Sequence, residues 1–202
     1  MSSAVDTPGG GAGERAVVSP GPSLAAKGNV SAHLNLVCRD ADGKVTSTFD
    51  KECDMTLLQS AQFFVVSQLN VSGLSFKDTS GASHAQTAQV LAGTPAIAFG
   101  TNGTAATWSD YVIGTSAGGA TNPVGASVTA IVAGGASGTF TVTATWNNTT
   151  AGTVTITELA LYITTTAGMA SNSTFAITHD VFTGQAVSAS GTAAATLTYT
   201  WS

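Results

Sequence analysis

Apolar and polar residues alternate strictly in the second half of the chain, and this alternation predicts β-strands. The run GTFTVTATW occupies residues 138–146, and the closing run AAATLTYTW occupies residues 193–201. Successive side chains of a strand point to opposite faces, so each run predicts one apolar face and one threonine face. In the first run the apolar residues are Phe140, Val142, Ala144 and Trp146, and the threonines are Thr139, Thr141, Thr143 and Thr145.

A second threonine-rich run, TVTITELALYIT, follows after the small polar stretch NNTTAG. We expect the two runs, within residues 138–164, to pair as a hairpin. The apolar positions change parity between Ile156 and Leu159, so either both faces are covered or a β-bulge near Thr157–Glu158 shifts the register. Glu158 is the single charge of both runs. We expect its carboxylate to accept hydrogen bonds from backbone N–H groups of a bulge or turn, or to pair with a cation from the first 77 residues.

The beginning of the chain has a different character. Residues 1–29 are rich in Gly, Pro, Ser and Ala, which predicts a flexible or extended N-terminal arm. Further along, Asp42-Gly43 lies between two strand-like runs and predicts a two-residue hairpin turn that places Cys38 opposite Ser47. The apolar residues between 56 and 69 recur at spacings of three and four, which predicts one helix near residues 56–69.

Short strand-like runs separated by Gly, Asn and Ser continue from residue 96 to the end, with a long connection over residues 101–123. This pattern is typical of a mainly β protein, an antiparallel β-sandwich of jelly-roll or immunoglobulin-like type. The expected organisation is the arm, residues 1–29, followed by one domain, residues 30–202, that includes the helix. The Gly-rich stretches lack the Lys-Ser/Thr ending of a phosphate-binding loop and are interpreted as turns.

Charge is scarce and unevenly distributed. Charged residues make up 8% of the 202 residues, against about 25% in a typical soluble domain, and no Lys or Arg follows Lys77. A surface with so little charge tends to associate, so we expect neighbouring subunits to cover it. The same scarcity of cations argues against binding of nucleic acid. No apolar stretch is long enough for a membrane span, and no secretory signal is visible.

The candidate chemistry is sparse. His33, His84 and His179 are the available imidazoles, and none lies in a catalytic motif. His179 and Asp180 are sequence neighbours in a predicted strand and therefore point to opposite faces. Glu158 could pair with Asp110 or with Asp180 as an acid–base couple, but nothing in the pattern predicts a cleft there. We therefore expect no catalytic residue, no cofactor and no metal site. The two cysteines, Cys38 and Cys53, are expected to be reduced thiols, and a bridge between them would require the chain to fold back after the hairpin.

The order of motifs across residues 33–202 resembles a loose group of tailed-bacteriophage virion proteins. The similarity is carried by DADGKV, IAFGTNGTAATWSDYVIGT, SGTFTVTATWNNTTAGTVTITELALYI, STFAITHDVF and ATLTYTW. Those proteins tend to have a Phe-Ala-Arg segment and an Ile-x-Glu-x-Gly-Leu strand end. This chain has Ile177 and Thr178 where the basic residue is usual, and Ala160 in place of Gly. The missing basic residue leaves Glu158 without the partner that it usually has in those proteins.

The resemblance implies a non-enzymatic structural virion protein, most consistent with an auxiliary capsid protein that decorates or cements the head of a tailed phage. Its implied partners are the major capsid protein or other virion subunits and further copies of itself, in a virion assembled in the host cytoplasm. A tail or fibre component or an extracellular filament subunit is the alternative, and an enzyme acting on surface glycans has the least support. The residues expected to form interfaces are Thr139, Thr141, Thr143, Thr145, Val17, Val18 and Leu24.

Overall fold

The computed structural model describes residues 30–53, 75–85, 92–107, 109–119, 121–129, 132–134, 137–167 and 173–201. Two sequence predictions fall outside these ranges: the N-terminal arm with Val17, Val18 and Leu24, and the helix near residues 56–69. Within the described ranges the chain is built of strands and loops, and no helix is found there. The protein is mainly β, as the alternation predicts.

Of the strands in the described residues, those between residues 75 and 134 are short except for β5, and the others are long. The strands are β1 (Val30–Arg39), β2 (Val45–Glu52), β3 (Ser75–Lys77), β4 (Ser83–Ala85), β5 (Ala92–Gly100), β6 (Val124–Gly125), β7 (Ser127–Val128), β8 (Val132–Gly134), β9 (Ser137–Asn147), β10 (Val154–Ala167), β11 (Thr174–Val187) and β12 (Thr192–Trp201).

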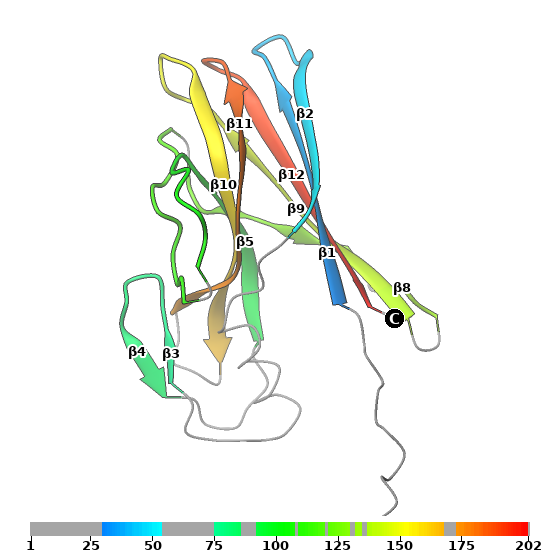
Figure 1. Cartoon of the computed structure of the whole chain (residues 1–202), viewed down its shortest axis with the longest axis vertical. Helices are drawn as coiled ribbons and strands as arrows, with labels where there is room; N and C mark the ends of the chain where they lie inside the picture. Colours follow the sequence, from blue (N-terminus) through cyan, green and yellow to red (C-terminus); the bar gives the residue numbers. More distant parts are fainter. Residues whose placement is uncertain are drawn as a thin grey trace, which may run out of the picture.

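Two antiparallel sheets contain the long strands (Figure 1). Sheet A has the order β2-β1-β12-β9-β7, with β8 also paired to β9, and sheet B has the order β11-β10-β5-β6. The strands β3 and β4 form a separate small hairpin. In sheet A the first and last long strands, β1 and β12, pair along their whole length.

The predicted hairpin over residues 138–164 is wrong. β9 pairs with β12 in sheet A, whereas β10 pairs with β11 and β5 in sheet B. The stretch NNTTAG therefore crosses from one sheet to the other instead of turning back within a sheet. The physical reason is that the apolar face of β9 faces the apolar face of β10 across the core, so the two strands meet through their side chains and not through backbone hydrogen bonds.

One hydrophobic core lies between the two sheets. Each long strand of sheets A and B contributes to it through alternate side chains, with those of β2 partly buried, and two aromatic contacts join the layers. Trp146 of β9 stacks against Phe99 of β5 with ring centroids 6.3 Å apart, and Phe49 of β2 stacks against Phe182 of β11 at 4.8 Å. Burying each such aromatic side chain contributes about 1.5–3 kcal/mol.

The faces of β9 and β12 follow the predicted alternation. Val142, Ala144 and Trp146 are buried in the core, and Phe140 is partly buried against it, while the threonines between them lie on the outer face of sheet A. The same holds along β12. The prediction of one core face and one threonine face is confirmed for both strands.

The first hairpin forms where Asp42-Gly43 predicts it, with a wider turn. Cys38 lies opposite Ser47, as expected. Asp40 and Lys44 close the turn through the bond Asp40 N–H to Lys44 O (3.0 Å), and Gly43 has a φ of 80°. This geometry is typical of a three-residue turn with a glycine in the left-handed region.

Both cysteines are free, as expected. Cys53 follows β2 and donates its backbone N–H to Ala32, six residues before Cys38 on β1. At about 3.3 Å per residue this separation is roughly 20 Å, too far for a disulfide. Burial raises the pKa of the Cys38 thiol.

The parity change in β10 allows either a β-bulge or the covering of both faces of the strand, and sheet B shows both. The pairing of β10 with β11 shifts register between Ile156 and Glu158 and again between Leu161 and Tyr162, so the bulge is confirmed. The outer face of the sheet is covered as well. A second apolar cluster lies there, made of Ala98, Ile113, Ala160, Tyr162 and Ala176.

Asn148, which begins the crossing from β9 to β10, ties two connections together. Its side chain is 1% exposed, and its amide donates to the carbonyl oxygens of Gly152, Val187 and Ser188 at 2.8–3.0 Å. Its Oδ1 accepts hydrogen bonds from the backbone N–H and the hydroxyl of Thr150. The ends of β9 and β11 are thereby held side by side.

We expect Asn148→Ala to lower the free energy of unfolding by about 2–4 kcal/mol, because the substitution leaves buried carbonyl oxygens without donors. The neighbouring exposed Asn147 is the matched control, and Asn147→Ala should change stability by less than about 0.5 kcal/mol. Urea unfolding followed by tryptophan fluorescence measures both. Equal stability of the two variants would contradict the role given to Asn148.

Candidate functional site

The connection between β5 and β6 folds back over the outer face of sheet B, and a buried carboxylate holds it there. Glu158 of β10 is 1% exposed. Its Oε1 accepts the backbone N–H groups of Asn102 (3.0 Å) and Thr115 (2.9 Å), and its Oε2 accepts that of Gly114 (2.9 Å). One side chain thus fixes both ends of the segment 102–115 to the sheet, and we name this segment the covering loop.

Two glycines make room for this arrangement. Gly100 lies opposite Glu158 on the neighbouring strand β5, and a Cβ at that position would overlap the Glu158 side chain. A Cβ on Gly114 would overlap the side chain of Asn102. The absence of a side chain at these positions lets the backbone approach the carboxylate closely.

His179 of β11 completes the partners of Glu158. Its side chain is 5% exposed, and its Nε2 lies 2.9 Å from Glu158 Oε2. Its Nδ1 lies 2.9 Å from Asp110 Oδ2 in the covering loop. Ionised carboxylates only accept hydrogen bonds, so both contacts are hydrogen bonds when the imidazole carries a proton on each nitrogen, which is its cationic form.

Asp110 anchors the middle of the loop. Burial acts to raise the pKa of Asp110, but hydrogen bonds from the side chain and backbone of Thr107, together with His179, outweigh it and hold the pKa below its ordinary value. The ionised form of Asp110 is therefore favoured in the folded protein. We name Asp110, His179 and Glu158 the acid–imidazole cluster.

Every polar atom of this cluster has a partner within the cluster or the loop. Both nitrogens of His179 face carboxylate oxygens, and both oxygens of Glu158 accept two hydrogen bonds each. A general base needs a free nitrogen or oxygen directed at a substrate.

The cluster borders a cavity of about 150 Å³, which is also lined by Asn102 and Thr104. The imidazole lies between the carboxylates, and among the residues that the structure describes no group of three or more His, Cys, Asp or Glu side chains could hold a metal ion.

Of the two partners predicted for Glu158, backbone N–H groups or a cation from the first 77 residues, the first is confirmed. Backbone N–H groups satisfy its carboxylate, whereas Lys51, a basic residue of the first 77, is bound to Asp180 at 3.0 Å. Of the two acids considered as partners of Glu158, Asp110 is linked to it through His179, and Asp180 is 6% exposed on the opposite, inner face of β11. His179 and Asp180 lie on different faces, as predicted.

Sequence reasoning missed His179 as the partner of Glu158. A signal was present, because the resembled proteins usually carry a basic residue where this chain has Ile177 and Thr178, and the imidazole of His179 follows directly. The other two histidines pair with acids as well: His33 with Asp50 at 2.9 Å, and His84 with Asp78 at 2.8 Å.

The predicted interface threonines lie far from the acid–imidazole cluster, in the other sheet. Thr139, Thr141 and Thr143 are partly buried on the outer face of β9, and Thr145 is exposed there. In the pairing with β12, Thr139, Thr141 and Thr143 stand opposite Thr200, Thr198 and Thr196. We name these seven residues the threonine face.

No family model matches this chain, and no curated protein and no solved structure matches it. Among the described residues, no helix is long and apolar enough to cross a membrane.

We expect Glu158→Gln to lower the free energy of unfolding by about 1–3 kcal/mol. Each oxygen of Glu158 accepts at least one backbone N–H, so the NH₂ group of Gln has to face a donor in either orientation. Glu52→Gln, at an exposed position of β2, is the matched control and should be nearly neutral. Chemical unfolding measures both, and an unchanged stability of Glu158→Gln would contradict the account.

We expect Gly100→Ala to destabilise the protein by about 1–3 kcal/mol, because the added methyl group displaces Glu158 from the loop N–H groups. Gly103 lies in the same loop with open space around it, so Gly103→Ala should leave stability unchanged or slightly raised. Thermal unfolding of the two variants makes the comparison. Similar melting temperatures would show that the space at Gly100 is not needed.

Proposed function

We propose that this chain is a structural protein of a tailed-phage virion, an auxiliary capsid protein that decorates or cements the head through subunit contacts. The observation that carries the proposal is the threonine face. It supplies an outer sheet surface that is free of charge, and it is built for contact with another protein instead of with water.

The chemistry of the threonine face favours protein contact. Threonine is β-branched and fits the pleated surface of a sheet, and rows of cross-strand pairs such as Thr143 with Thr196 give that surface regular order. Its hydroxyls can form hydrogen bonds with a partner without the desolvation cost of a buried ion.

Charge is found on the neighbouring side of the same sheet. The exposed pair of His33 and Asp50 joins β1 and β2, with Arg39 and Glu52 also exposed on these two strands. An uncharged centre beside a charged margin is the usual composition of protein interfaces. This distribution supports a contact centred on β9 and β12.

The acid–imidazole cluster supports a structural function over a hydrolytic one. Its carboxylates and imidazole satisfy each other and the backbone of the covering loop. A glycan-active enzyme needs two carboxyl groups that flank a scissile bond. Here His179 lies between Asp110 and Glu158, where the substrate would have to lie.

We further propose that the two sheets form a β-sandwich closer to the jelly-roll type than to the immunoglobulin type. In the described residues, the seven strands of eight or more residues can be lettered A to G in chain order, which gives the sheet orders B-A-G-D and F-E-C. A constant-type immunoglobulin domain has the orders A-B-E-D and C-F-G. The pairing of the first and last long strands within one sheet favours the jelly roll.

A tail or fibre component, or an extracellular filament subunit, is the alternative structural function, since the threonine face would serve lateral contacts there equally well. The number of copies in purified particles separates the alternatives. A copy number near that of the major capsid protein supports decoration, whereas a few copies per particle support a tail fibre.

We expect the double variant Thr145→Lys, Thr198→Lys to fold normally and to lose assembly, because two cations on the threonine face would have to be desolvated in the contact. Both positions point away from the core. Co-sedimentation of the purified variant with particles or with oligomers of the chain measures the effect, and a loss of at least about tenfold in binding is expected, about 1.4 kcal/mol.

The matched control is Thr153→Lys, Ala186→Lys, which adds the same charge at exposed positions on the sheet B side of the molecule. It should assemble like the unmodified chain. Normal assembly of the threonine-face variant, or equal loss in both variants, would contradict the proposed contact surface.

A further inference from the structure

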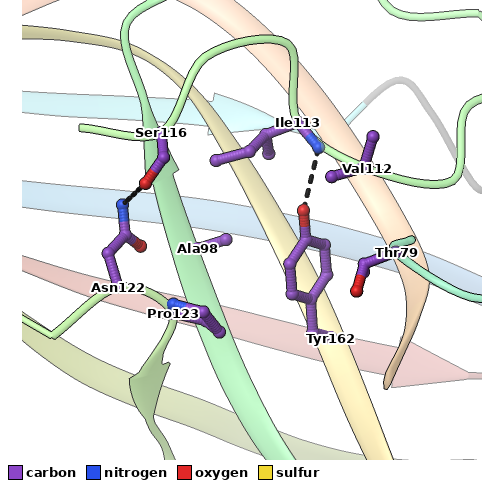
Figure 2. Close-up of a pocket in the computed structure, with 8 residues that line it drawn as sticks. All are labelled: Thr79, Ala98, Val112, Ile113, Ser116, Asn122, Pro123 and Tyr162. Carbon is purple, nitrogen blue, oxygen red and sulfur yellow. Dashed lines mark hydrogen bonds between the residues drawn. The ribbon is translucent and has the colours of Figure 1, made fainter. Parts of the chain in front are cut away.

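A second cavity, separate from the acid–imidazole cluster, opens on the outer face of sheet B (Figure 2). It has a volume of about 210 Å³ and lies between the covering loop, the β3–β4 turn and the segment that begins β6. The described residues that line it carry no charge. They are Thr79, Ala98, Val112, Ile113, Ser116, Asn122, Pro123 and Tyr162.

The buried phenol of Tyr162 supplies an unused hydrogen-bond donor at this cavity. The Tyr162 side chain is 3% exposed, and its oxygen accepts the backbone N–H of Ile113 at 2.8 Å. Its own O–H proton finds no acceptor among the described residues. Burial, opposed by the bond from Ile113 and reinforced by the charge of Glu158, raises the pKa of Tyr162 to about 12, so the proton stays in place at neutral pH.

The other polar groups of the cavity are mostly used within the protein. The Asn122 amide donates to Phe99 O (2.6 Å) and to the Ser116 hydroxyl (2.8 Å), and its oxygen accepts the Phe99 N–H (3.0 Å). The Thr79 hydroxyl forms no hydrogen bond with the described residues. Among the described lining residues, the free polar groups are therefore those of Tyr162 and Thr79, because those of Asn122 and Ser116 are already hydrogen-bonded.

We propose that this cavity binds a neutral, mainly apolar group with one hydrogen-bond-accepting oxygen, as an aliphatic side chain and its adjacent backbone carbonyl present it in a peptide segment of a partner protein. The apolar body packs against Ala98, Val112 and Pro123, and the carbonyl oxygen accepts the O–H of Tyr162. This inference concerns the chemistry of the cavity alone and does not depend on the assignment to a virion.

Two other classes of ligand fit the cavity less well. A charged group would lose its hydration with no countercharge among the lining residues that the structure describes. A sugar ring carries several hydroxyls, and with two free polar groups in the wall most of them would be buried without partners, each at a cost of about 1–3 kcal/mol.

The test is a titration of the intact, ¹⁵N-labelled chain with N-acetyl-L-leucine amide, followed by the backbone amide signals. We expect a saturable shift of the Ile113 amide with a Kd on the order of 1–10 mM, which suits so small a probe. N-acetyl-L-leucine has the same shape with a negative charge and should bind at least about tenfold more weakly. Methyl α-D-glucopyranoside should bind more weakly still.

Two variants locate the binding. Tyr162→Phe removes the donor and keeps the ring, and it should weaken binding of the amide about five- to tenfold. Val112→Trp obstructs the cavity from an exposed position, leaves the Tyr162 side chain unchanged, and should abolish the shift. The Val112 variant decides the matter if Tyr162→Phe does not fold. Absence of a saturable shift, a shift that survives Val112→Trp, or tighter binding of the sugar or of the charged probe would overturn the inference.

Discussion

The arrangement of the covering loop depends on one buried charge. Glu158 is placed by a bulge in β10, in the middle of a sheet, where it is only 1% exposed. A carboxylate in that position has to be satisfied by donors, and the loop after β5 brings three backbone N–H groups to it. The hydrogen bonds to Glu158 hold the loop in place, and the same hydrogen bonds offset the cost of burying the carboxylate.

His179 extends this constraint across the sheet. It lies on β11 between Glu158 and Asp110, so the strand, the sheet centre and the loop are joined through one imidazole. Tyr162 adds a further link to the same loop through Ile113. The cavity beside Tyr162 exists because these links hold the loop above the sheet while the small side chain of Ala98 leaves space below it.

The two outer faces of the molecule thus differ in what covers them and in which polar groups they carry. Sheet B is covered by its own loop, and the carboxylates and the imidazole of the acid–imidazole cluster are paired with each other and with that loop. The threonine face of sheet A has no such cover in the described part of the chain, and it has replaced charge by hydroxyls. This difference supports the proposed assembly contact at β9 and β12 and the proposed binding cavity on the opposite side.

Much of the fold could be predicted from alternation alone. The core faces of β9 and β12, the opposition of Cys38 and Ser47, and the bulge near Glu158 follow from local patterns, because strand parity and turn residues act over a few positions. The hairpin over residues 138–164 was wrong because alternation shows which face is buried and not which strand is the neighbour. The partnership of Glu158 with His179 was missed for the same reason: a pairing across strands depends on the register of two bulges, which no local pattern contains.

Amide hydrogen exchange in the unmodified protein tests the central claim most directly. If Glu158 holds the loop, the N–H groups of Asn102, Gly114 and Thr115 will be protected to a degree similar to the ladder amides of β10, although they belong to a loop. The amide of Gly103, one residue further along, should exchange much faster. Exchange of Asn102, Gly114 and Thr115 at the rate of Gly103 would show that the carboxylate does not bind the loop.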